Sequence, residues 1–128
     1  MLNLSLIETS MAFMHVEDDI LYITLKEDAD LKVENIDEMI DARIRIQNGK
    51  KMKVIADIRN IWQASLKARK RAASSEMQSQ NIAMAIVTDS LASKLLANFF
   101  IKINKPSSPT RMFNSKEEGL LWLNTIGV

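Results

Sequence analysis

Two aspartates follow two of the most apolar stretches of the chain and could do acid–base or metal chemistry. Asp57 follows the apolar run 54–56, and Asp89 comes shortly after the apolar run 82–87. Both runs are typical of strands buried on both faces, and ligands of open α/β sheets usually bind at the carboxyl ends of such strands. Two carboxylates there could hold Mg²⁺ or share a proton, as an enzyme would require. The alternative is structural and the one we favour: Asp89 caps a helix, and Asp57 pairs with Arg59 or accepts backbone hydrogen bonds.

The rest of the composition excludes several other kinds of site. The chain has no cysteine and a single histidine, His15. Thiolate nucleophiles, disulfides and cysteine-based metal centres are therefore excluded, as is a multi-histidine metal site within one chain. With only 3 glycines, no glycine-rich phosphate loop is present. We therefore expect no catalytic residue, no metal and no cofactor.

The charge balance argues against nucleic acid as a partner. The 17 basic and 16 acidic residues give a net charge of +1, whereas nucleic-acid binding normally needs a clear basic excess. A local basic run, residues 67–71, could contact RNA phosphates or anionic lipid. Because no aromatic residue interleaves with this run, we interpret it as a solvated helix face.

The most unusual stretch is a helix predicted from Asp89 or Ser90 to about Ile103. Its apolar residues spread around much of the circumference, whereas a surface helix needs only one apolar stripe. Such a helix is either deeply buried or contacts a ligand or partner. Trp62 adds a large aromatic side chain in the loop after the strand at 54–56. The candidate binding residues are Trp62, Leu96, Phe99, Phe100 and Ile103.

Hydrophobic periodicity predicts the elements that position these residues. Period-two patterning predicts a β-hairpin from residues 11–16 and 20–25, with a possible edge segment at 2–7. The other expected elements are helices at 33–48, 65–80, 89–103 and 115–127, and strands at 54–56, 82–87 and 111–113. Small residues on the inner face of the second helix should let it lie close to the sheet. The order predicts one α/β domain over residues 1–128, a mixed sheet with an N-terminal hairpin and four helices.

This element order resembles that of SpoIIAA-like domains, the fold shared by STAS domains and some lipid-binding domains. More narrowly, the chain is similar to small uncharacterised bacterial proteins of the STAS/SEC14 type. The supporting segments are VIADIRNI at 54–61, NFFIKINKP at 98–106, and EEGLLWL at 117–123 after Phe113. The resemblance implies the fold, and it implies a protein partner or a lipid-like ligand equally.

Ser65 falls near the position at which regulatory STAS domains carry a phosphorylated serine. Those domains have an Asp-Ser-Ser-Gly-like stretch there, whereas this chain reads IWQASL at 61–66, without the Ser-Gly pair. A helix N-cap explains Ser65 without phosphorylation, and we favour the cap.

Taken together, these features predict a non-catalytic binding or assembly module acting through the helix at 89–103. Its partner would be a second copy in a homodimer, another protein or a hydrophobic ligand, and the alternative is an enzyme using Asp57 and Asp89. The N-terminus lacks the basic region of a signal peptide, and no apolar run reaches the roughly 18 residues of a transmembrane segment. We therefore expect a cytoplasmic protein.

Overall fold

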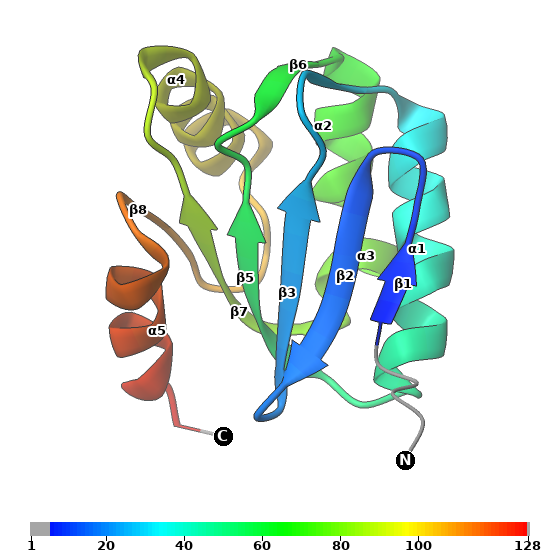
Figure 1. The fold of residues 1–128 in the computed structure, drawn as a ribbon, viewed down its shortest axis with the longest axis vertical. Coiled ribbons are helices and arrows are strands. Elements are labelled where there is room, and N and C mark those ends of the chain that lie inside the picture. The colour runs from blue at the N-terminus through cyan, green and yellow to red at the C-terminus, as the bar shows by residue number, and fades with distance from the viewer. Residues whose placement is uncertain (1–5, 128) are drawn as a thin grey trace.

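The protein is described here by a computed structural model, which covers residues 6–127. A six-stranded mixed sheet in the order β1-β2-β3-β5-β7-β8 forms its centre (Figure 1). The strands β1, β2 and β3 pair antiparallel, and β3, β5, β7 and β8 run parallel. Their bounds are β1 Leu6–Glu8, β2 Ala12–Glu17, β3 Ile20–Leu25, β5 Met52–Asp57, β7 Asn81–Val87 and β8 Thr110–Phe113. The predicted hairpin, the later strands and the mixed α/β sheet are confirmed.

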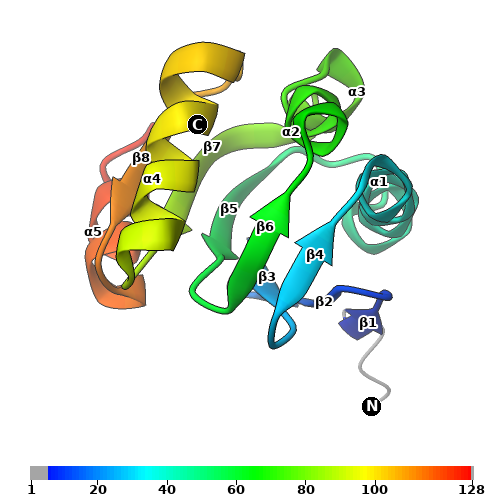
Figure 2. The same cartoon turned by 90° about the horizontal axis from the view of Figure 1, so that it is seen from above.

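A second, two-stranded parallel sheet crosses the end of the molecule at which β3 and β5 finish. It consists of β4, Ala29–Leu31, and β6, Ile61–Ala64 (Figure 2). Neither strand was expected, because each is too short to show a period-two pattern and its only partner is the other.

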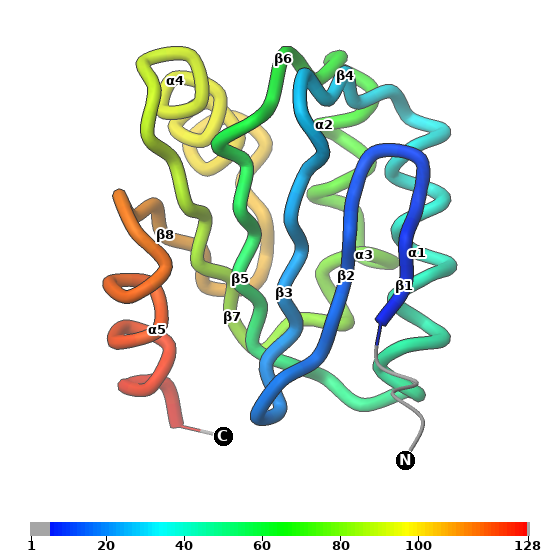
Figure 3. The backbone as a smooth tube through the Cα atoms, viewed as in Figure 1, coloured from blue at the N-terminus to red at the C-terminus, as the bar shows by residue number. Residues whose placement is uncertain are grey.

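Helices cover both faces of the main sheet, as the path of the backbone shows (Figure 3). They are α1 Val33–Gln47, α2 Leu66–Ala72, α3 Ser75–Gln78, α4 Leu91–Phe99 and α5 Lys116–Asn124. The expected single helix over 65–80 is wrong: the chain is extended at Ser74, which splits it into α2 and α3. The described residues thus form five α-helices rather than four. The helix predicted to end at about 103 continues from α4 into a π-helix, η1, Phe100–Asn104.

Two apolar clusters hold the layers together, one on each face of the sheet. The face under α5 has Ile55, Ala85 and Leu123 fully buried. Gly119 lets α5 approach closely, since a Cβ there would lie 3.1 Å from the Cβ of Ala85. The larger cluster on the other face lies among the sheet, α1, α2 and the α4–η1 helix.

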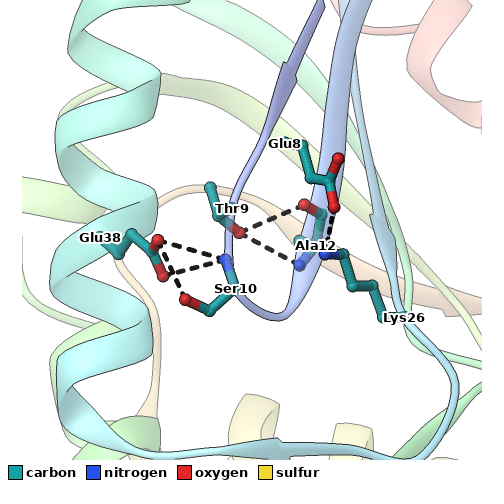
Figure 4. Close-up of polar contacts among 6 residues, drawn as sticks. All are labelled: Glu8, Thr9, Ser10, Ala12, Lys26 and Glu38. Atoms are coloured by element: carbon teal, nitrogen blue, oxygen red, sulfur yellow. Dashed lines mark hydrogen bonds and ion pairs between the residues drawn. The ribbon is translucent and has the colours of Figure 1, made fainter.

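The turn between β1 and β2 is attached to α1 by polar contacts (Figure 4). The backbone N–H of Ser10 donates to both carboxylate oxygens of Glu38 at 3.1 and 3.2 Å. The hydroxyl of Thr9 donates to the carbonyl of Ala12 and accepts from its N–H. Lys26 on the far side of the hairpin pairs with Glu8. Part of the predicted edge segment, Leu6 and Ile7, is thus strand β1, and residues 2–5 lie outside the described residues.

Candidate functional site

An apolar cavity of about 120 Å³ lies between the main sheet and the helices above it. Its floor is formed by side chains of β3, β5 and β7, and its walls by α1, β6 and the α4–η1 helix. Helix α2 lies above it and contributes Ala68, Arg69 and Ala72 to its lining. The apolar side chains that line it include Ile23, Leu25, Ile36, Met39, Ala56, Ile61, Ala68, Ala72, Met84, Ile86, Leu96 and Phe100.

The sheet residues that line the cavity keep a small fraction of their surface exposed. On the cavity face, Ala56 and Met84 keep 7% and 6% of their surface exposed, although the helices cover them. On the opposite face, under α5, Ile55 and Ala85 are at 0%. Val54, on the same face as Ala56 but outside the cavity lining, is also at 0%, so the small exposures mark the lining residues rather than the whole face.

The cavity exists because the roof has short side chains. Helix α2 packs along α1 and touches η1, and it has no comparable contact with the main sheet. It presents Ala68 and Ala72 to the space below. Ala68 is 1% exposed and belongs to the core cluster on this face of the sheet, and Ala72 packs against the same cluster. These alanines are short, and they leave space below the helix that larger side chains would fill.

The candidate residues of the third predicted helix divide between the cavity and the surface. Leu96 and Phe100 line the cavity. Phe99, Ile103 and the strand residue Trp62 are exposed, Trp62 by 68%. The apolar residues of this helix therefore lie on two sides: those on one side complete the cavity wall, and those on the other face outward.

Two polar side chains, Arg69 and Gln78, reach the lining of the cavity. Gln78 is satisfied, since its amide NH₂ donates to the carbonyl of Ala72 and its oxygen accepts from Ser108. The guanidinium of Arg69 lies 4.5 Å from the centre of the Phe99 ring. Its Nε is buried and has no hydrogen-bond partner among the described residues. The lining of the cavity is therefore apolar apart from Gln78 and part of the Arg69 side chain.

Asp57 and Asp89 do not form a pair of free carboxylates. Asp57 accepts two hydrogen bonds from the Arg59 guanidinium, at 2.9 and 2.7 Å, and Lys116 lies 3.9 Å away. Burial would raise the pKa of Asp57, but the hydrogen bonds and charge of Arg59, with Lys116, lower it below its usual value. Asp89 is exposed, and the N-cap of α4 is Ser90. Among residues 6–127, no three His, Asp or Glu side chains are grouped so as to hold a metal ion.

Ser65 is the N-cap of α2, as predicted. Its hydroxyl oxygen accepts a hydrogen bond from the N–H of Ala68 at 3.0 Å. In the basic run that follows, Arg71 pairs with Asp37 of α1 and with Glu76. The run therefore serves partly as a bridge between α2 and α1.

A second buried polar group, Arg43, was not foreseen as unusual. Its side chain is 0% exposed and donates to Gln47 at 2.7 Å and to Asn81 at 2.5 Å, without a carboxylate partner. Burial lowers the pKa of Arg43 to about 10. The signal in the sequence was the position of Arg43 and Gln47 on the apolar face of α1. This network joins α1 to the start of β7, and through Ser108 it continues to Gln78 at the cavity.

The sequence analysis named Leu96 and Phe100 as candidates for contact with a ligand or partner, but it did not identify the part of the lining that α2 forms. Ala68 and Ala72 are small residues at helical spacing, and the sequence cannot tell whether such a stripe draws a helix in or leaves a gap. The position of α2 on α1 decides this, and it depends on contacts between distant segments.

Comparison with known proteins supports the fold and leaves the chemistry open. Residues 14–127 match the family model "Domain of unknown function (DUF7793)". No curated protein matches the chain. A similar solved structure is an uncharacterised protein of the DUF3478 family from Shewanella loihica PV-4, which has a SpoIIAA-like fold. The likeness has a TM-score of 0.60 at 14% identity and covers 88% of this chain and 91% of that one. The SpoIIAA-like fold is thus confirmed, and the chain belongs to the DUF7793 family.

Proposed function

We propose that this member of the DUF7793 family is a non-catalytic binding module that holds a small apolar molecule in the cavity under α2. The observation that carries the proposal is the cavity itself, about 120 Å³ of space with an almost entirely apolar lining. An engineered apolar cavity of roughly 150 Å³ in another protein stays dry and binds benzene. The space is thus of the right size for a molecule of about one ring or a short chain.

The free-energy balance favours a ligand over an empty space. A cavity of this volume costs about 3 kcal/mol of stability at about 24 cal/mol per Å³. Water would find few hydrogen-bonding partners on these walls. An apolar ligand would restore the missing contacts between the sheet and α2, and would thus stabilise the folded state.

Arg69 adds a preference for one end of the ligand. Its buried Nε lacks a hydrogen-bond partner among the described residues, and a buried unsatisfied donor is costly. An oxygen at one end of the ligand would accept this hydrogen bond, and a carboxylate would also match the charge. The ligand class that we propose is therefore a small aromatic or aliphatic acid.

Benzene and benzoate test this proposal, because they differ only in the carboxylate. Titration of the full chain, followed by ¹H–¹⁵N NMR, should give saturable shifts at residues around the cavity, such as Ile23, Ala56 and Met84. Benzoate should bind more tightly than benzene, by about tenfold or more for a charged hydrogen bond. Arg69→Met should remove that difference and leave benzene binding intact.

The matched variants are Ala68→Leu, which fills the cavity, and Ala92→Leu, which makes the same change on an exposed position of α4. The first should abolish the shifts and the second should keep them. If neither probe gives saturable shifts in the wild type, or if Ala68→Leu binds as well as the wild type, the cavity is not the binding site.

A further inference from the structure

The charges of the chain are strongly segregated, although they nearly cancel. Ten of the 17 basic residues and none of the 16 acidic residues fall in two segments, 58–75 and 90–116. The rest of the chain holds seven basic residues and all the acidic ones. The net charge of +1 therefore hides one strongly basic and one strongly acidic part.

The two basic segments come together in space. They contain β6, α2, α4, η1 and β8, and α4 contacts both β6 and β8 while α2 contacts η1. Figures 1 and 2 show β6, α4 and the start of α2 at one end of the molecule, where the parallel strands finish.

Part of this basic charge is free. Arg59, Arg71 and Lys116 are paired with carboxylates contributed by other segments. Five lysines make no ion pair with any residue in 6–127, and four of them are exposed. They are Lys67 and Lys70 on α2, Lys94 on α4, Lys102 on η1, and Lys105, which follows η1.

The same segments carry most of the exposed apolar surface. Of ten large hydrophobic residues exposed among those described, six belong to them: Trp62, Leu66, Leu91, Leu95, Phe99 and Ile103. On α4, Leu91, Leu95 and Phe99 are spaced by four residues, and so they form one outward stripe. Leu91 and Leu95 are 74% and 60% exposed.

We propose that this basic and apolar end, formed by β6, α2 and the α4–η1 helix, docks onto the surface of an anionic lipid bilayer. Lysines around exposed Leu, Ile, Phe and Trp side chains are the composition of segments that lie in a membrane interface. The lysines would meet anionic headgroups, and the α4 stripe and Trp62 would enter the interfacial region. Among residues 6–127 no helix is both long enough and apolar enough to span a bilayer.

Charge and side-chain type favour a bilayer over two other occupants. A second copy paired through α4 would bring Lys94 and Lys102 against their own counterparts, with no acidic residue in α4 or η1 to offset them. A nucleic acid would need side chains that stack on bases, and most of the exposed apolar residues at this end are aliphatic. The inference goes beyond the proposed ligand and does not depend on it.

Vesicle sedimentation tests the proposal with the full chain. At low salt, we expect binding to vesicles of phosphatidylglycerol and phosphatidylcholine in equal parts, and none to phosphatidylcholine alone. Lys67→Gln combined with Lys102→Gln should weaken binding about 25-fold, at about fivefold per lysine. Leu95→Ser should weaken it about tenfold or more through lost apolar burial.

Matched controls at other places make the same chemical changes. Lys50→Gln with Lys51→Gln removes two lysines at the opposite end of the sheet, before β5, and Leu121→Ser removes an exposed leucine of α5. Both should bind like the wild type. Ala68→Leu, which fills the cavity, should also bind vesicles normally, so that failure of the proposed ligand leaves this result unaffected. Circular dichroism confirms that each variant is folded.

Several results would overturn the proposal. One is that the wild type does not bind anionic vesicles at low salt. Another is that the two control variants lose as much vesicle binding as the variants of the basic end. Binding to polyuridylate RNA or to polyglutamate without binding to vesicles would show a different partner. A dimer in light scattering that Leu95→Ser converts to a monomer would show that a second copy covers this surface.

Discussion

Filling the cavity from its roof should stabilise the protein, which is unusual for a small-to-large change at a buried position. Ala68 is 1% exposed and lines the cavity from α2. Leucine at this position adds three carbon atoms, and it keeps the helix propensity nearly unchanged. Elsewhere in a close-packed core the same change would cause overpacking.

The magnitude follows from the cavity volume. Three buried carbon atoms contribute about 2.4 kcal/mol at about 0.8 kcal/mol each. Filling all 120 Å³ would recover at most about 3 kcal/mol. Fixing the leucine rotamer costs about 0.5–1 kcal/mol. We therefore expect Ala68→Leu to raise the free energy of unfolding by about 1.5–2 kcal/mol.

Urea unfolding followed by circular dichroism measures this change. With a slope of about 2 kcal/mol/M, the midpoint should rise by about 0.8–1 M without a change in slope. Ala92→Leu, exposed on α4, should stay within about 0.5 kcal/mol of the wild type. A lower midpoint for Ala68→Leu would refute the reasoning, because it would mean that α2 already packs against the sheet with no space to fill.

Two further predictions concern the polar groups near the ends of the elements. Ser65→Ala should lower the free energy of unfolding by about 0.5–2 kcal/mol in the same assay. Ser65→Asp should be tolerated, because Asp also caps helices and suits the helix dipole. Phosphate found on Ser65 in cells, with a partner that binds only one form, would support the regulatory interpretation instead. The pKa of Asp57 is lower in the folded state than its usual value, so the stability it adds should be present at neutral pH and lost as the pH falls through its folded pKa. Unfolding curves of Asp57→Asn should show a weaker loss of stability in acid than the wild type, and parallel curves for the two proteins would contradict the assigned ion pair.

The elements with a clear period were predictable from the sequence. The hairpin Ala12–Leu25, the helix α1 and the buried strands β5 and β7 follow directly from the spacing of apolar residues. The cap at Ser65 was also predictable from the sequence, because an N-cap hydrogen bond joins residues within one helical turn.

What could not be predicted depends on contacts between distant segments. The break between α2 and α3 places Gln78 so that it donates to Ala72 and accepts from Ser108, thirty residues later in the chain. The cavity likewise depends on how α2 packs against α1 and η1, which are distant from it in the sequence. The basic end was hidden for a different reason, because a net charge sums over the whole chain and does not show how charges are distributed in space.

Diffraction from a crystal of the wild-type protein pressurised with xenon tests the central claim most directly. Xenon enters apolar cavities of about this size. The account predicts electron density for xenon between Ala68 of α2 and the sheet residues Ala56 and Met84, which line the cavity from opposite sides. Continuous side-chain density between α2 and the sheet, with no xenon there, would contradict the cavity and the ligand proposed for it.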